Sequence, residues 1–349
     1  MITKFMSKIW GVCTTTKKGR ILISFVKWCF TEYRVNVVNL FRKPKVKTAP
    51  FVVAIELTNH CPMECVMCPH QNMTRCKGFM SEDTFLNILS QMVYYSEKFY
   101  QQKHPVCLHN FGESLLHDSV DIYAKCLKDY GFPVYLSVNP MQLDGRWSVL
   151  KRLLKNNILS ELILSVDGWS EDSFKRIRGR DGYEKTVFNT ELVLLFKKHC
   201  NSKTRVTVQM IDLPAPGEEE EKAKRVTAWK KHPDIDNFVL KQPANFDGSI
   251  DRIKEATGVA SVKPRRRTVC RALWSHVVVL WNGDVVPCCN DFNGDAVLGN
   301  INKESFLKIW NSARVSRLRK QMIKASKNNN ISQGLPRCCR NCRALWDLW

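Results

Sequence analysis

Three cysteines stand close together early in the chain and offer a group of metal ligands. They form the sequence Cys61-Pro-Met-Glu-Cys65-Val-Met-Cys68, a C-x3-C-x2-C spacing. Three thiolates on one short loop can hold three irons of a 4Fe–4S cluster, which ordinarily takes four cysteines. The fourth iron would keep an open coordination position, the property that separates catalytic from structural metal sites. A zinc site completed by His60 or His70 is the alternative.

A second group of cysteines lies toward the C-terminal end. A C-x17-C spacing joins Cys270 to Cys288, and a C-x2-C pair follows at Cys339 and Cys342, so four thiolates are available for one closed site. Two of these ligands have an adjacent cysteine as an alternative, because Cys289 adjoins Cys288 and Cys338 adjoins Cys339. Only Cys339 gives the C-x2-C spacing, and Cys288 directly follows an expected strand. A structural four-cysteine zinc site is the alternative here.

The elements that must position these cysteines follow an alternating order from about residue 50. Short apolar runs predict strands, and amphipathic segments between them predict helices. The predicted strands are 51–57, 106–111, 134–138, 161–166, 205–210 and 237–241, and the predicted helices are 82–95, 120–130, 146–154, 184–198 and 219–230. Six such units indicate an α/β fold, an incomplete (β/α)6 TIM-like barrel, whose chemistry sits at the carboxyl ends of the strands.

The pattern changes after residue 250. Pro264-Arg265-Arg266-Arg267 is typical of a linker, and Asn282-Gly283 between apolar runs at 275–280 and 284–286 predicts a hairpin with a type I′ turn. A helix is expected from Lys303, with Phe306, Leu307, Trp310 and Leu318 on its apolar side. We therefore expect a basic extension at 1–47, a barrel at 48–248, and a small hairpin-plus-helix metal domain at 249–349.

The cysteine spacing after the first strand resembles the radical S-adenosyl-L-methionine (radical SAM) family. Further family-like motifs follow at the ends of strands two, three and four, and an Arg-Gly pair comes next. They are His109-Asn-Phe-Gly112-Glu113, Ser137-Val-Asn139, Leu164-Ser165-Val-Asp167-Gly168 and Arg178-Gly179. Phe111 replaces the first glycine of the family's Gly-Gly-Glu motif. The resemblance covers about residues 50–245.

This resemblance implies a cofactor and a set of contacts. A 4Fe–4S cluster on Cys61, Cys65 and Cys68 would chelate SAM. The cofactor-binding residues would be Gly112, Glu113, Ser137, Asn139, Ser165 and Asp167. One electron from the cluster would cleave SAM to a 5′-deoxyadenosyl radical, which abstracts a hydrogen atom from an unactivated C–H bond. The protein aims the substrate and excludes water.

The C-terminal region is similar to the SPASM/twitch extension of the same enzymes. The similarity rests on Trp274, on the stretch 282–289, on Leu298-Gly299-Asn300 and on Ile309-Trp310-Asn311. It implies one auxiliary 4Fe–4S cluster on Cys270, Cys288, Cys339 and Cys342, because no second cysteine follows Cys270 closely enough for a two-cluster arrangement. A cluster closed by four thiolates suits electron transfer better than substrate binding.

These features lead to two enzymatic hypotheses. In the first, the enzyme oxidises or crosslinks a sugar, aminocyclitol or peptide, and the auxiliary cluster accepts the second electron. In the second, a redox-neutral epimerase returns a hydrogen atom from a thiol, for which Cys289 is the candidate. A flavodoxin- or ferredoxin-type electron donor is implied in both. Surface positions are the ordinary interpretation of Arg178 and Tyr183, although both could face the site.

Composition limits the remaining choices. The chain has 349 residues, a formal net charge of +21, 15 cysteines and 44% hydrophobic residues, which excludes a mainly disordered protein. No apolar run reaches the roughly 18 residues of a membrane span. No signal peptide is evident, so we expect a cytoplasmic protein with reduced thiols.

The positive charge concentrates at the two ends of the chain. Residues 1–47 carry eleven Lys and Arg against Glu32 alone, and residues 303–343 carry eleven against Glu304 alone. The first stretch could form a helix on an anionic membrane surface, although packing on the main domain is the ordinary interpretation. An RNA-modifying protein is a third hypothesis, but the basic runs lack the interleaved aromatic residues of single-strand readers.

Overall fold

A computed structural model describes residues 43–99, 103–244, 246, 269–328, 334–340 and 342. The helix expected within the basic extension at 1–47 lies outside these ranges except for residues 43–47, and the predicted linker at 264–267 lies outside them entirely. In the part of the chain that the structure describes, no helix has the length and apolarity needed to cross a bilayer.

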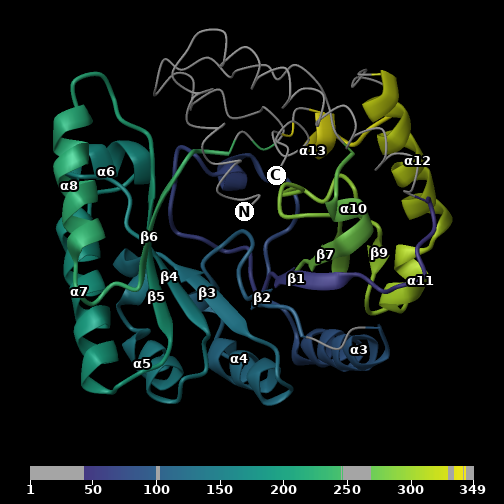
Figure 1. The fold of residues 1–349 in the computed structure, drawn as a ribbon, viewed down its shortest axis with the longest axis horizontal. Coiled ribbons are helices and arrows are strands. Elements are labelled where there is room, and N and C mark those ends of the chain that lie inside the picture. Colours follow the sequence, from purple (N-terminus) through teal and green to yellow (C-terminus); the bar gives the residue numbers. More distant parts are fainter. Residues whose placement is uncertain are drawn as a thin grey trace, which may run out of the picture.

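The centre of the fold is one nine-stranded sheet in the order β6-β5-β4-β3-β2-β1-β7-β8-β9 (Figure 1). Neighbouring strands from β6 to β7 are parallel, whereas β8 and β9 are antiparallel additions. The order is linear, so the barrel is incomplete, as predicted. The strands are β1 Phe51–Ile55, β2 Val106–Cys107, β3 Val134–Val138, β4 Glu161–Ser165, β5 Arg205–Ile211, β6 Asn237–Lys241, β7 His276–Val279, β8 Asp284–Val286 and β9 Gly299–Asn300.

Helices connect the parallel strands and cover the outer side of the curved sheet (Figure 1). They are α3 Glu82–Phe99, α4 Val120–Asp129, α5 Trp147–Lys155, α6 Glu171–Arg178, α7 Tyr183–His199 and α8 Glu219–Lys231, with 3-10 turns η1 Pro69–Asn72, η2 Ser114–Leu116 and η3 Pro140–Leu143. In α5, apolar residues recur so that Val149, Leu150, Leu153 and Leu154 share one buried face. That face belongs to the same hydrophobic core as the buried residues of the strands.

The C-terminal part contains α10 Ala272–Ser275, α11 Phe306–Trp310, α12 Ala313–Asn328 and α13 Arg337–Arg340. Its strand β7 pairs with β1 in parallel, with Phe51 opposite His276 and Ile55 opposite Val279. The predicted C-terminal hairpin therefore extends the barrel sheet directly. The strands that lead into the two groups of cysteines therefore belong to one continuous hydrogen-bonded sheet.

Three local predictions need correction. The hairpin loop has three residues instead of a two-residue type I′ turn, because the Gly283 N–H bonds to the Leu280 carbonyl and only Gly283 has positive φ, at 84°. The single helix expected from Lys303 is divided into α11 and α12 at Asn311-Ser312. The helix α6 was not predicted, although Ser170 and Ser173 form a capping box at its start.

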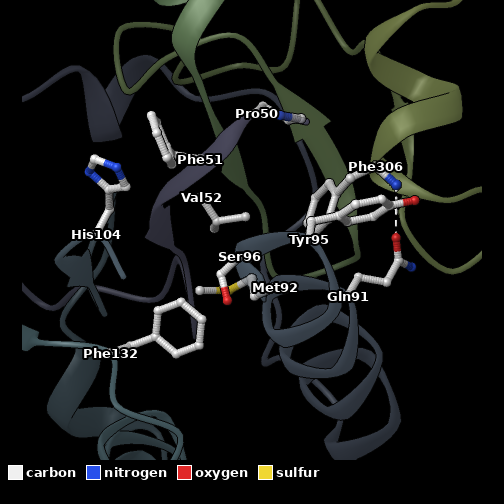
Figure 2. A pocket seen from close by; sticks show the side chains of 10 residues that line it. All are labelled: Pro50, Phe51, Val52, Gln91, Met92, Tyr95, Ser96, His104, Phe132 and Phe306. Atoms are coloured by element: carbon white, nitrogen blue, oxygen red, sulfur yellow. Dashed lines mark hydrogen bonds between the residues drawn. The ribbon is translucent and has the colours of Figure 1, made fainter. Parts of the chain in front are cut away.

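A small apolar cavity of about 30 Å³ lies at the amino end of β1 (Figure 2). Pro50, Phe51 and Val52 line it from the strand, and Tyr95 from α3 faces them. The Phe306 N–H donates to Gln91 Oε1 at 2.8 Å and closes one side. Its volume suits about one water molecule. The cavity is at the amino end of the strand and belongs to the packing of α3 and α11 against the sheet.

Candidate metal centres and active site

The first group of cysteines, Cys61, Cys65 and Cys68, lies on the loop after β1. Cys65 is buried, and Cys61 and Cys68 are partly exposed. Burial raises the pKa of Cys61 to about 11 and that of Cys68 to about 12, and the Cys65 thiolate contributes to both increases. The three thiols are therefore close neighbours in a poorly solvated place. Metal loading must displace their protons, and this makes it more favourable as the pH rises.

The zinc alternative needs His60 or His70 as a fourth ligand, and both rings have other partners. His70 Nε2 lies 2.8 Å from the Asn59 carbonyl oxygen. The His60 ring stacks on Phe79 with 4.7 Å between centroids. The contact with the backbone therefore makes His70 Nε2 a poor fourth ligand.

Gly112 packs directly against the chain that leads into this loop. Its φ is +100°, and a Cβ there would lie 2.4 Å from the Thr58 carbonyl oxygen and 2.8 Å from Asn59 Cα. The next residue, Glu113, donates its N–H to the His60 carbonyl at 2.8 Å. Only glycine allows this approach, so the end of β2 and the cysteine loop are fitted to each other.

Glu113 is buried and links the ends of β2 and β3. Its Oε2 accepts from the Asn139 N–H at 3.0 Å, and its Oε1 accepts from the Leu115 N–H at 3.3 Å. Burial raises the pKa of Glu113 to about 7, partly offset by these two hydrogen bonds. The carboxyl group is thus poised to change protonation near neutral pH, beside the thiol of Cys61.

Several buried polar atoms at this edge have no partner among the described residues. They are His109 Nδ1, Asn110 Oδ1, Asn139 Nδ2 and Arg178 Nε. Nearby, the hydroxyls of Ser137 and Ser165 lie 3.4 Å apart at the ends of β3 and β4. Buried polar groups are normally hydrogen-bonded. This arrangement of unmatched donors and acceptors fits a polar ligand at the carboxyl edge of β2–β4.

Asp167 and Arg178 form a buried ion pair between β4 and the cysteine loop. Arg178 Nη2 lies 2.7 Å from Asp167 Oδ2 and donates to the Ser165 carbonyl at 2.9 Å, while Nη1 donates to Cys65 Sγ at 3.5 Å. Burial alone would lower the pKa of Arg178, but Asp167 and the Cys65 thiolate outweigh it and raise the pKa. Asp167 Oδ1 accepts from the Ile211 N–H at 2.6 Å. Both Asp167 oxygens therefore have protein partners, and Arg178 faces the site rather than the surface.

The α6 helix brings Arg178 to the loop. Its last residues meet the cysteine segment, because the Val66 N–H donates to the Ile177 carbonyl at 2.8 Å. Gly179 ends the helix with φ +76°, and a Cβ there would lie 2.7 Å from the Glu64 carbonyl oxygen. Tyr183, the other residue singled out after β4, is buried and its ring lies 6.2 Å from Phe174.

The second group of cysteines comes together from three segments. Cys270 lies just before α10, Cys288 follows β8, and Cys339 and Cys342 lie in and just after α13. Burial raises the pKa of Cys270 to about 12, and Cys339 and Cys342 add to the rise. Burial also raises the pKa of Cys288, with contributions from its neighbour Cys289 and from Cys270, Cys339 and Cys342. The Asn290 side chain donates to Cys342 Sγ at 3.1 Å. The predicted set of four thiols is therefore assembled in space.

The two cysteines that adjoin proposed ligands, Cys338 and Cys289, lie in different surroundings. Cys338 Sγ lies 3.9 Å from Cys339 Sγ, so it stays beside the group of four. Cys289 lies near Cys107 of β2, whose pKa is raised to about 12 by burial, with smaller effects from Tyr135, Cys289 and Lys241. Sequence reasoning did not single out Cys107, Tyr135 or Lys241. Their positions on β2, β3 and β6 could have indicated side chains inside the barrel, because alternate residues of barrel strands point inward.

The described residues include no three His, Cys, Asp or Glu side chains close enough to share a single metal ion. Each thiolate of a 4Fe–4S cluster binds its own iron, so cluster ligands do not have to meet at one point.

Comparison with known proteins bears on the choice between a zinc site and an iron–sulfur cluster in the C-terminal region. The family model of the SPASM iron–sulfur cluster-binding domain matches residues 270–343. This chain carries a SPASM domain. The match covers all four predicted auxiliary ligands and confirms the resemblance inferred for this region.

Most of the chain is similar in fold to several solved structures. One is BtrN in complex with AdoMet and 2-DOIA, at 19% identity and TM-score 0.54 over 85% of this chain and 94% of that chain. Another is Streptococcus suis SuiB bound to precursor peptide SuiA, at 12% identity and TM-score 0.56 over 85% of this chain and 70% of that chain. A third is anSMEcpe with bound AdoMet, at 15% identity and TM-score 0.51 over 84% of this chain and 86% of that chain. At these identities the likenesses show a shared fold alone, and a search of curated proteins found no match.

Proposed function

We propose that this chain is a radical SAM enzyme that oxidises or crosslinks its substrate with the help of one auxiliary 4Fe–4S cluster. The observation that carries the proposal is the close fit of the Gly112–Glu113 turn to residues 58–60, which lead into the loop with the three thiols at the carboxyl edge of the sheet. The region that matches the SPASM domain joins the same sheet. The domains proposed are a basic extension at 1–47, a radical SAM core at 48–248 and an auxiliary cluster domain at 249–349.

The first site would hold a cluster on Cys61, Cys65 and Cys68 and SAM against the ends of β2–β4. Bound together, the reduced cluster and SAM supply hydrogen-atom abstraction from an unactivated substrate C–H bond. The residues present fit SAM, because its amine, carboxylate and ribose hydroxyls can satisfy the unpartnered Asn139 amide, the Arg178 Nε and the serine hydroxyls. Gly112 leaves room for the backbone approach, and Glu113 offers a carboxylate to a cation above pH of about 7.

Arg178 and Asp167 act on the loop rather than on the substrate. The guanidinium holds Cys65 Sγ and the Ser165 carbonyl in fixed relation, and Asp167 fixes the guanidinium. Among the proposed SAM contacts, Asp167 thus has a positioning role through Arg178.

The auxiliary cluster would be held by Cys270, Cys288, Cys339 and Cys342. Four thiolates leave it no open position, so we propose that it accepts the second electron in a net two-electron oxidation. The Asn290 amide, bonded to Cys342 Sγ, would stabilise negative charge on that thiolate. A flavodoxin- or ferredoxin-type protein is the proposed electron donor, and the reducing cytoplasm the proposed compartment.

The substrate class follows from the fold neighbours only as a proposal. SuiB was solved with a precursor peptide and BtrN with 2-DOIA, so peptides and small molecules such as sugars or aminocyclitols are the candidates. A peripheral contact of the basic N-terminal extension with a membrane belongs to the same proposal.

Anaerobic reconstitution with iron and sulfide tests this function. The wild-type chain should hold about eight irons, four for each cluster, and should cleave SAM to 5′-deoxyadenosine after reduction. The Cys61→Ala/Cys65→Ala/Cys68→Ala variant should hold about four irons and should not cleave SAM. The matched variant with alanine at Cys270, Cys288, Cys339 and Cys342 should also hold about four but should still cleave SAM. Iron-loaded, reduced wild-type protein without SAM cleavage would refute the proposal.

Epimerisation is a second candidate, favoured by the position of Cys289, which follows the proposed ligand Cys288 and also lies near Cys107 and Tyr135 of the barrel strands. A thiol there could return a hydrogen atom to a substrate in the barrel. The Cys289→Ala variant would then lose product while keeping SAM cleavage, and solvent deuterium would enter the wild-type product. Retained turnover in Cys289→Ala would exclude this role.

A further inference from the structure

A buried ion pair outside all the motifs connects the two halves of the site. Glu56 directly follows β1 and its side chain is 0% exposed, while the Arg75 side chain is 13% exposed. Arg75 Nη1 donates to Glu56 Oε1 at 2.7 Å, and Nη2 donates to Oε2 at 2.5 Å. The Asn110 amide donates to the same Oε2 at 3.1 Å. One carboxylate thus joins β1, the end of β2 and the cysteine-bearing loop.

The other side of Arg75 reaches the SPASM domain. Its Nε donates to the Phe292 carbonyl at 2.7 Å. Beside it, Asn293 Oδ1 accepts from the Thr74 N–H at 2.7 Å, and the Asn293 amide donates to Thr74 Oγ1 at 2.8 Å. Residues 292–293 follow Cys288 closely in sequence, and residues 74–75 follow Cys68. The contact therefore ties the two cysteine-bearing segments to each other.

Only arginine can make this set of contacts. Its three nitrogens lie in one plane, so two can bind a carboxylate as a fork while the third addresses a carbonyl. A lysine ammonium could keep the attraction to Glu56 but could not hold both partners in fixed directions. Because the pair is buried, removing either partner leaves an uncompensated charge.

We propose that Glu56 and Arg75 are positioning residues that fix the separation and orientation of the two cluster-binding segments. This inference rests on the proposed function, because the fixed relation matters most if an electron passes from the substrate site to the auxiliary cluster. Neither side chain needs to touch a cluster or SAM. Their effect runs through the loop at 69–80 and the segment at 288–296.

The experiment compares Arg75→Met and Arg75→Lys with Arg176→Met. Arg176 is a matched control, because it binds the Glu218 carboxylate and donates to the Leu213 carbonyl at 3.0 Å, and neither partner belongs to the segments at 69–80 and 288–296. In metal-free protein, amide hydrogen exchange of both segments should rise together on the order of tenfold in Arg75→Met. In Arg75→Lys the rise should be smaller and strongest around residues 290–293. In Arg176→Met both segments should exchange as in the wild type.

The reconstituted proteins provide a second measurement. The magnetic dipolar coupling between the two reduced clusters, measured by pulsed electron paramagnetic resonance, should be narrowly distributed in the wild type and broadened in Arg75→Met at unchanged iron content. Wild-type exchange in both segments of Arg75→Met would overturn the inference, and so would equal effects in Arg176→Met. If Arg75→Met fails to fold, Arg75→Lys decides on the same criteria. A wild type without two clusters would overturn the proposed function, whereas the metal-free exchange would still judge the ion pair.

Discussion

Replacing Gly112 by alanine should displace the loop that carries the first cysteines. The new Cβ would lie 2.4 Å from the Thr58 carbonyl oxygen and 2.8 Å from Asn59 Cα, both backbone atoms that a side-chain rotation cannot move. The residue would also have to keep φ near +100°. An L-residue in left-handed backbone costs about 1–2 kcal/mol, and overpacking costs about 1–3 kcal/mol. We therefore expect the free energy of unfolding to fall by about 2–5 kcal/mol.

Gly145→Ala is the matched control. Gly145 has φ +73°, but nothing lies within 4 Å of the place that a Cβ would take there, so only the backbone cost of about 1–2 kcal/mol applies. Denaturant unfolding of the metal-free proteins gives both values. SAM binding to the reconstituted proteins should be lost in Gly112→Ala and kept in Gly145→Ala. Equal destabilisation of the two variants, with SAM binding retained in both, would show that the close approach of Gly112 has no bearing on the site.

Three further predictions concern single side chains. Arg178→Met should leave the Asp167 carboxylate buried without its partner, so the free energy of unfolding should fall by about 3–5 kcal/mol. The double variant Asp167→Asn/Arg178→Met should recover part of this loss, and no recovery would contradict the pairing. Cys339→Ala should reduce iron from about eight to about four per chain, whereas Cys338→Ala should keep about eight, and the reverse outcome would exchange their roles. Glu113 has a folded pKa of about 7 against 4.5 for an exposed group, so its contribution to stability is present below pH of about 4.5 and lost as the pH rises to about 7. Metal-free Glu113→Gln should lack this part of the slope in denaturant unfolding between pH 5 and about 7.5, and an unchanged slope would show that Glu113 does not titrate there.

The barrel could be predicted from sequence because its strands are short apolar runs separated by helices. The predicted bounds of β3 and β6 match those observed, since Val134–Val138 and Asn237–Lys241 are each bounded by polar or turn residues. The helix α6 escaped prediction because its eight residues contain only Phe174 and Ile177 as apolar anchors. The break between α11 and α12 was equally hidden, since apolar spacing continues across Asn311.

The proximity of Cys61, Cys65 and Cys68 could be predicted, because their spacing is a local property of the chain, whereas the metal-binding role of both sets of cysteines stays a prediction. The surroundings of Cys289 and the pairing of Glu56 with Arg75 were not, because each depends on segments far apart in sequence that only the sheet brings together. A single charged residue after an apolar strand, as at Glu56, indicates a strand end but does not name its partner.

The insertion of β7 beside β1 has a consequence for biogenesis. During synthesis β1 emerges early and can pair with β2, but its other side stays an open edge until residues 276–279 have been made. An unpaired, apolar edge is a template for association with other chains. A chain truncated after β6 would keep that edge permanently, so we expect it to aggregate even though all six barrel strands are present. Protection of this edge by a chaperone until β7 has been made would then increase the yield of folded protein.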